Sequence, residues 1–270
     1  MTFLVTGATG NAGRRVVEHL LRKGERVRAL TRHPEKAGLP GEVEVVAGDL
    51  TDPSTLDFRG VTGIHLLTIG GDDYATLRTG PDIVDLAARQ GVRKVVTLWN
   101  GRRGPVEEAV ENSGLEWTHI EPVDFMSNSL HWADAVRTNG KVEEPFADSL
   151  NAVVHESDVG AVAATLLVED GHAGKRYSLT GPEALSPRAK LEIIGQVIGK
   201  DLEFVELTEA QARQRWRRAG HADEMIEVLV AWQSNPPAEA YTVTSTVEDV
   251  TGRPPKSFRQ WAEENADRFR

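Results

Sequence analysis

Short apolar runs alternate with longer amphipathic segments through the first 120 residues of the chain. The runs are nearly continuous in apolar residues, which is typical of strands buried on both faces. The longer segments repeat apolar residues at helical spacing, as Val16, Val17, Leu20 and Leu21 do. The pattern predicts strands over residues 2–6, 27–31, 43–47, 61–69, 92–99 and 115–120, and helices over 11–23, 72–90 and 106–112.

The second half of the chain is less regular and is dominated by helical spacing. Strands are predicted at 151–155 and 176–179, and Ser157 or Asp158 is expected to cap a helix that runs to Glu169. The remaining pattern predicts helices over 123–138, 187–198, 209–219, 223–233 and 258–269.

Strands that alternate with helices are typical of βαβ units, whose strands form a parallel sheet. The expected fold is α/β, a doubly wound parallel sheet of the Rossmann type with a smaller, mainly helical C-terminal lobe. Residues 1–125 and 151–179 are assigned to the sheet domain. Residues 126–150 and 180–270 are assigned to the smaller lobe.

Composition excludes several classes of site and partner. The 270 residues include no cysteine, which excludes disulfides, thiolate metal sites and a cysteine nucleophile. The eight histidines lack the spacing of metal ligands, so no metal is expected. The formal net charge of −10 opposes direct binding of nucleic acid.

The sequence shows no feature of a membrane or secreted protein. No apolar run reaches the roughly 18–20 residues of a membrane span. The N-terminus lacks the basic and apolar regions of a signal peptide. We therefore expect a cytoplasmic protein with a small-molecule substrate, and leave open whether it forms a homo-oligomer.

A glycine-rich loop, Gly7-Ala-Thr-Gly10-Asn-Ala-Gly13, lies between the first predicted strand and the first predicted helix. In a dinucleotide-binding loop the first glycine permits a tight turn, the second lets the pyrophosphate approach, and the third lets the helix pack closely on the sheet. The amides near Asn11 and Ala12 are then expected to face the anion, with Thr9 beside it. The alternative is a glycine-rich turn that binds no ligand.

The residues after the second predicted strand bear on the choice of cofactor. An NAD site of this kind has an acidic residue there, which bonds the ribose 2′-hydroxyl. The chain has Thr31-Arg32-His33 instead, and an arginine can bind a 2′-phosphate with two hydrogen bonds. The expected cofactor is therefore NADP(H). His33 can add a second donor there. The alternatives are that Arg32 is a solvated strand end and that His33 is a surface histidine, which is the favoured interpretation of His33.

The TGATG form of the glycine loop resembles the short-chain dehydrogenase/reductase superfamily. This resemblance implies that Gly48-Asp49-Leu50 borders the adenine and that Leu67-Thr68-Ile69 passes the adenosine ribose. Trp99 and Pro122 complete the expected contacts with the cofactor.

The catalytic Tyr-x-x-x-Lys pair of that superfamily is missing. In that pair the tyrosine donates a proton and the lysine lowers its pKa. Tyr74, Tyr177 and Tyr241 have no lysine at the fourth following position, and none follows the fifth predicted strand. The superfamily's catalytic residues therefore cannot be assigned to this chain.

The remaining motifs resemble the NmrA-like family of atypical members, near its NADPH-dependent quinone reductases. That family includes quinone reductases, tailoring enzymes, and redox-sensing regulators that bind NADP without turnover. Glu121-Pro122 departs from the Arg-Pro of many relatives. The motifs that carry the resemblance are Val27-Arg-Ala-Leu-Thr-Arg32, Ser113-Gly-Leu-Glu-Trp-Thr118, Phe125-Met-Ser-Asn128, His155-Glu-Ser-Asp-Val159 and Tyr177-Ser-Leu-Thr-Gly-Pro-Glu183.

Asn100 and His131 are the candidate catalytic residues, because their segments are expected to face the nicotinamide end of the cofactor. Aromatic and apolar side chains on these segments predict a pocket for a flat substrate, with ordinary packing between lobes as the alternative. The pocket residues are Trp99, Phe125, Met126 and Trp132.

The expected function is reduction of a quinone-like or other conjugated acceptor by hydride transfer from NADPH. A conjugated acceptor forms a stable oxyanion and so needs no strong acid. The alternatives are a non-catalytic NADP(H) sensor and a tailoring enzyme, such as a dehydratase or cyclase, on the same fold.

Overall fold

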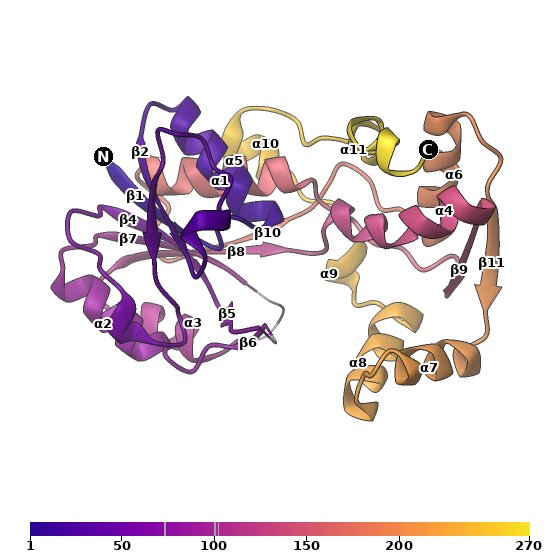
Figure 1. Ribbon diagram of the computed structural model, residues 1–270, viewed down its shortest axis with the longest axis horizontal. Coiled ribbons are helices and arrows are strands. Elements are labelled where there is room, and N and C mark those ends of the chain that lie inside the picture. Colours follow the sequence, from indigo (N-terminus) through magenta and orange to yellow (C-terminus); the bar gives the residue numbers. More distant parts are fainter. Residues whose placement is uncertain (73, 100, 102) are drawn as a thin grey trace. The chain divides into compact units, whose positions relative to one another are not determined.

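The computed structural model describes residues 1–72, 74–99, 101 and 103–270 (Figure 1). These residues form two compact units, each assembled from separate stretches of the chain. Unit 1 comprises Met1–Pro122, Glu156–Leu179 and Thr246–Arg253, and unit 2 comprises Val123–His155, Thr180–Ser245 and Pro254–Arg270.

Unit 1 contains a parallel sheet to which seven strands of the described chain contribute, in the order β10-β8-β7-β4-β1-β2-β3. The order changes direction between β1 and β4, which is where a doubly wound sheet opens a crevice at its carboxyl edge. The predicted fold class is therefore confirmed. The strands are β1 Thr2–Thr6, β2 Arg26–Thr31, β3 Glu44–Ala47, β4 Gly63–Leu67, β7 Lys94–Leu98, β8 Glu116–Pro122 and β10 Lys175–Leu179.

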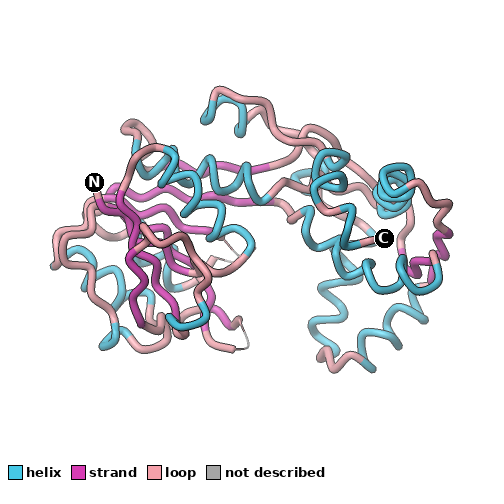
Figure 2. The backbone as a smooth tube through the Cα atoms, turned by 45° about the horizontal axis from the view of Figure 1, so that its top comes forward, coloured by secondary structure: helices cyan, strands magenta, loops and turns pink. Residues whose placement is uncertain are grey.

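Helices cover both faces of this sheet (Figures 1 and 2). One face carries α2 Gly80–Arg89 and α3 Pro105–Glu111, and their apolar residues share a core with Leu4, Ile64 and Leu66 of the sheet. The other face carries α1 Asn11–Arg22 and α5 Glu156–Val168. These two helices pack so closely that a Cβ on Gly160 would lie 2.5 Å from the Arg15 backbone.

Unit 2 is mainly helical and has a core of large side chains, among them Trp261, Phe258, Phe269 and Trp132. A short parallel pair of strands lies beside the helices. Its elements are η3 Met126–Trp132, α4 Ala133–Asn139, β9 Lys141–Pro145, α6 Pro187–Ile198, β11 Glu203–Leu207, α7 Glu209–Arg218, α8 Asp223–Ser234, α9 Ala238–Tyr241, α11 Phe258–Glu264 and η4 Ala266–Arg268.

Three predicted elements differ from the structure. The helix predicted over 72–90 begins at Gly80, because a small hairpin of β5 Ile69–Gly70 and β6 Ala75–Thr76 occupies the preceding residues. The strand predicted at 151–155 forms single bridges at Asn151 and Val154. The helix predicted over 123–138 is a 3₁₀ turn followed by a short α-helix.

The expected cap of α5 is also wrong. The helix begins at Glu156, so Ser157 and Asp158 lie inside its first turn. In addition, the expected lobe 180–270 is interrupted at Thr246–Arg253, where α10 Thr246–Thr251 packs against α5 and β10 of unit 1.

One polar side chain in the sheet of unit 1 is completely enclosed. His65 lies on the middle strand β4 and points to the face opposite Ile64 and Leu66. Neither ring nitrogen has a hydrogen-bond partner among the described residues. Burial lowers the pKa of His65 to about 4, because the charged imidazolium cannot be solvated there.

We predict that His65 makes the protein acid-sensitive between about pH 6.5 and pH 4. The unfolded state binds the extra proton in this window, so the free energy of unfolding falls as the pH falls. The difference in pKa corresponds to roughly 3 kcal/mol for this one group. In urea unfolding between pH 4 and pH 7.5, His65→Leu should flatten this dependence, whereas exposed His221→Leu should keep it. An unchanged slope in His65→Leu would contradict the assignment.

Candidate cofactor site

The glycine loop joins the end of β1 to the start of α1, as the sequence predicts. Gly7 has a φ of +60°, and a Cβ there would lie 2.5 Å from the Leu67 side chain. A Cβ on Gly13 would lie 2.0 Å from the Gly7 carbonyl oxygen. The folded loop therefore requires glycine at both positions, independently of any ligand.

Gly10 is less constrained. Apart from its chain neighbours, a Cβ built there has one described atom within 4 Å, the Gly7 carbonyl oxygen in a tight contact at 3.3 Å. The Gly10 amide donates a hydrogen bond to that oxygen at 2.9 Å, which closes the turn. A side chain at residue 10 would therefore enter the pocket beside the loop, as expected where a pyrophosphate approaches.

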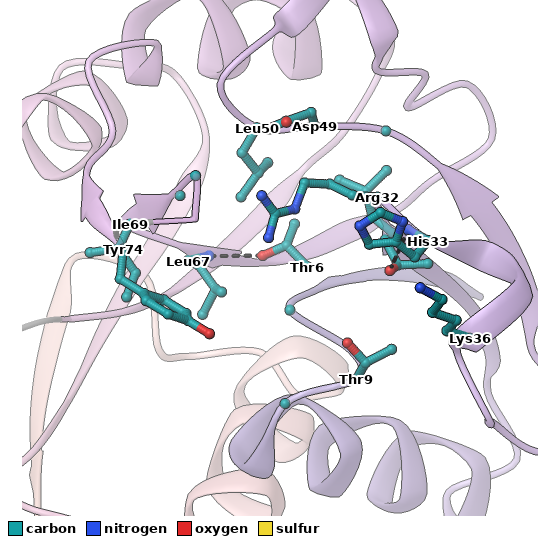
Figure 3. Close-up of a pocket in the computed structure, with 17 residues that line it drawn as sticks. Thr6, Thr9, Arg32, His33, Lys36, Asp49, Leu50, Leu67, Ile69 and Tyr74 are labelled. Atoms are coloured by element: carbon teal, nitrogen blue, oxygen red, sulfur yellow. Dashed lines mark hydrogen bonds between the residues drawn. The ribbon is translucent and has the colours of Figure 1, made fainter.

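This pocket has a volume of about 360 Å³ and lies at the carboxyl ends of β1, β2 and β4 (Figure 3). Thr6 lines the pocket and joins two of these strands. Its hydroxyl donates to the His65 carbonyl oxygen at 3.0 Å and accepts from the Leu67 amide at 2.9 Å. These two bonds tie β1 to β4 where the strand order changes direction. The residues lining the pocket are Thr6, Gly7, Thr9, Gly10, Leu30, Thr31, Arg32, His33, Lys36, Gly48, Asp49, Leu50, Leu67, Ile69, Gly70, Gly71 and Tyr74.

Three basic side chains, Arg32, His33 and Lys36, lie together on one side of this pocket (Figure 3). The Arg32 guanidinium donates to Asp72 at 2.6 Å, and the Asp72 side chain is 96% exposed. An ion pair so open to solvent contributes little stability. The arginine is therefore available to an incoming phosphate.

Asp49 also lines the pocket, and its carboxylate is hydrogen-bonded by Thr51. The hydrogen bond from the Thr51 amide, at 2.8 Å, lowers the pKa of Asp49, with smaller contributions from the Thr51 hydroxyl and the charge of Arg32. The carboxylate is thus ionised and fixed in position. Together with the loop and the basic cluster, the pocket fits the adenosine and phosphate half of a nicotinamide dinucleotide.

The structure brings nine of the residues predicted to lie at the cofactor to this pocket: Gly7, Thr9, Gly10, Arg32, Gly48, Asp49, Leu50, Leu67 and Ile69. Six others do not line it. Ala12 and Gly13 are buried behind the loop, Asn11 begins α1, and Thr68 is buried with its hydroxyl directed to the Leu98 carbonyl. Trp99 follows β7 and Pro122 ends β8, so their contacts with a cofactor stay predictions.

The sequence analysis did not identify several lining residues. Lys36 follows a proline turn in a loop, and Tyr74 lies in the β5–β6 hairpin with a φ of +53°. His33, interpreted as a surface histidine, lines the pocket. Tyr74 is 73% exposed, and Figure 3 shows its ring directed to the pocket beside Leu67. No periodic pattern marks such residues, because they come from irregular segments.

The expected substrate residues have different environments. Met126 is fully buried in the core of unit 2, so it cannot line a pocket, and Phe125 is half-buried next to it. Trp132 belongs to the same core but also lines a second cavity, within unit 2. Asn100 lies outside the described residues.

His131 lines that second cavity, and both of its ring nitrogens are engaged. Nε2 lies 2.8 Å from Glu144 Oε1, and Nδ1 faces the Asn128 carbonyl oxygen. Burial opposes the charged form, but these two hydrogen bonds raise the pKa of His131. Both nitrogens are thus engaged within the protein, and the catalytic role of His131 stays a prediction.

Comparison with known proteins agrees with the pocket. A family model described as NAD(P)H-binding matches residues 7–101. A curated relative, the (4-alkanoyl-5-oxo-2,5-dihydrofuran-3-yl)methyl phosphate reductase of Streptomyces griseus, is 37% identical over 98% of this chain and 98% of its own.

Two solved structures share the fold over nearly the whole chain. An NADPH-dependent quinone oxidoreductase from Escherichia coli, complexed with NADPH, has a TM-score of 0.81 at 22% identity, over 97% of this chain and 99% of that one. NmrA, a negative transcriptional regulator in complex with NADP, has a TM-score of 0.72 at 19% identity, over 97% and 94%. The chain belongs to the NmrA-like family of atypical short-chain dehydrogenases/reductases. Because curated relatives at 30% identity or more over 98% of the chain are reductases, it is an NAD(P)H-binding oxidoreductase.

Two negative findings apply to the part of the chain that the structure describes. No group of histidine and acidic side chains there could hold a metal ion. None of its helices is both long enough and apolar enough to cross a membrane.

We predict that Gly10→Val abolishes NADPH binding without unfolding this NmrA-like protein. The valine side chain would occupy the pocket, while the core stays intact. Titration calorimetry should detect no NADPH binding, and thermal unfolding should stay close to wild type. Gly41→Val is the matched control, because a Cβ there meets no described atom within 4 Å. Normal NADPH affinity in Gly10→Val would place the dinucleotide elsewhere.

Proposed function

We propose that this protein uses NADPH in preference to NADH. Its substrate is either a quinone or a compound with a carbon–carbon double bond conjugated with a carbonyl group. The observation that carries the proposal is a pocket suited to a dinucleotide in a chain that lacks the Tyr-x-x-x-Lys acid. When bound, NADPH supplies a hydride and is oxidised to NADP⁺.

The three tyrosines of the chain are not placed as general acids in the structure. Tyr177 lies on β10 with its hydroxyl 2.7 Å from His172 Nδ1, and Tyr241 ends the short helix α9 in unit 2. Tyr74 lies beside the adenosine half of the pocket. A simple ketone needs a nearby acid, because hydride addition to it forms a basic alkoxide.

A conjugated acceptor has a lower requirement. A hydride adds to the carbon distant from the carbonyl, the electrons of the double bond move toward the carbonyl oxygen, and an enolate forms. A proton from water then completes the product. The enolate or hydroquinone anion is much less basic than an alkoxide. The protein can therefore supply most of the rate acceleration by positioning the acceptor against the hydride donor.

The relative from Streptomyces griseus supports this substrate class. Its name describes a dihydrofuranone ring with a double bond next to both an alkanoyl and a lactone carbonyl, and with a phosphate ester. At 37% identity over nearly the full length, a conjugated carbonyl acceptor is the natural proposal for this chain too.

We predict that Arg32→Ala removes most of the preference for NADPH over NADH. An arginine–phosphate pair contributes about 1.5–3 kcal/mol, so NADPH affinity should fall at least tenfold while NADH affinity is nearly constant. Asp72→Asn should act in the opposite direction, because it removes the carboxylate that competes for Arg32. Calorimetric titration of both cofactors checks this, with exposed Arg59→Ala as control. Equal affinities for the two cofactors in wild type would refute the preference.

We also predict the order of acceptors in a turnover assay. NADPH oxidation, corrected for the rate without protein, should be fastest with 1,4-benzoquinone and cyclohexenone, and at least about 100-fold slower with cyclohexanone. Comparable rates with cyclohexanone would mean that an acid has been overlooked. Absence of turnover with every acceptor, despite tight NADPH binding, would favour the sensor alternative.

A further inference from the structure

The second cavity lies wholly within unit 2 and has a volume of about 680 Å³. Three indole rings contribute to its wall, those of Trp132, Trp216 and Trp232. Flat, rigid surfaces of this kind suit a planar ligand. The function proposed above gives this cavity no role.

Lys190 also lines this cavity, from the first turn of α6, and it is an unusual lysine. The residue is 9% exposed. No hydrogen bond or ion pair among the described residues involves its ammonium group. The nearest aromatic contact is the Trp132 ring, with the nitrogen 5.7 Å from the ring centroid.

An ammonium group on a residue that is 9% exposed loses most of its hydration, and this loss is costly where no protein acceptor replaces the water. Burial lowers the pKa of Lys190, while Asp124 and Glu144 partly oppose this effect. The position on α6 adds to the cost, since the N-terminal turn of a helix already carries positive potential. Lysines with no function at such positions normally extend their nitrogen into solvent.

The nearby carboxylates cannot serve as its partners, because other donors saturate them. Glu144 accepts from His131 at 2.8 Å and from the Trp132 indole at 3.1 Å through one oxygen, and from Arg215 through the other. Its two oxygens are therefore engaged by these other donors, and Lys190 has no carboxylate partner there.

Asp124, the other acidic group that lines this cavity, is likewise occupied. It accepts from the Phe125 amide at 2.9 Å and from the side-chain amides of Asn128 and Asn151. Its negative charge acts on Lys190 and partly opposes the effect of burial on the pKa of that lysine.

We propose that the unit 2 cavity binds an anionic planar molecule, whose phosphate or carboxylate group pairs with Lys190 while its flat part lies against the indoles. If the proposed function is correct, this molecule is the acceptor, and the protein selects acceptors that carry an anionic substituent. The anion supplies the acceptor that the buried ammonium lacks.

Calorimetric binding of small probes to the full-length protein tests this without requiring turnover. The probes are 1-naphthyl phosphate, 1-naphthoate, 1-naphthol and inorganic phosphate. Wild type should bind one of the two naphthyl anions at least about tenfold more tightly than 1-naphthol, and the stronger of the two identifies the anionic group. Inorganic phosphate should bind weakly, because it lacks the ring.

Lys190→Met removes the charge and keeps a similar length, so it should abolish this tenfold advantage and leave 1-naphthol binding within about twofold. Lys190→Arg should restore much of the advantage. Lys200→Met, an exposed lysine of the same unit, is the matched control and should behave as wild type.

Thermal unfolding provides a second readout that a structural lysine would move in the other direction. Removing an unpaired buried charge should leave the melting temperature of Lys190→Met equal to or above that of wild type. A lower melting temperature of Lys190→Met would show that Lys190 supports packing and would overturn the proposal. An equal loss of 1-naphthyl phosphate and 1-naphthol binding in this variant would do the same. Failure of wild type to bind either anion would overturn it too.

The two proposals fail separately in these experiments. If no acceptor supports NADPH oxidation while the anion preference still depends on Lys190, the proposed reaction is wrong and the site stands. If conjugated acceptors are reduced but Lys190→Met binds anions normally, the reaction stands and the site is wrong.

Discussion

The cofactor pocket depends on one close approach between backbone segments. The Gly7 carbonyl oxygen occupies the place where a Cβ of residue 13 would be, at 2.0 Å. This contact brings the first turn of α1 against the end of β1, so that the helix begins at the crevice between β1 and β4. The Thr6 hydroxyl bonds then fix β4 to β1 at the same level. These few contacts position the glycine loop at the crevice, where we expect the pyrophosphate to approach.

The two units achieve their order by different physical means, and this explains how well each could be predicted. In unit 1 the period of the apolar residues decides most of the structure, because the central strands β1, β4 and β7 are buried on both faces and α1 on one. The strands and α1 therefore appear within one to three residues of their predicted bounds. The α6 helix of unit 2 matches its predicted bounds, since a serine cap and a proline mark its start.

The failures occur where contacts distant in sequence override local pattern. The strands β9 and β11 pair with each other across some sixty residues and have no strong alternation of their own. The β5–β6 hairpin interrupts a segment that is helical by spacing, at Gly71 and Tyr74 with positive φ. The burial of Lys190 could not be predicted for a related reason, because a lysine in the first turn of an amphipathic helix resembles an ordinary surface residue. Its burial arises from packing that no local pattern encodes.

The distribution of charge links the two cavities. The chain carries a formal net charge of −10, yet the groups facing the first pocket include Arg32, His33 and Lys36, and those facing the second include Lys190 and Arg215. In a protein of net negative charge, cationic groups that face a cavity raise the local potential there and favour anions that fit. The phosphates of a dinucleotide meet this condition in unit 1. A buried cation that lacks any acceptor in unit 2 is understandable on the same physical grounds, as a charge kept in place for a ligand that brings the opposite one.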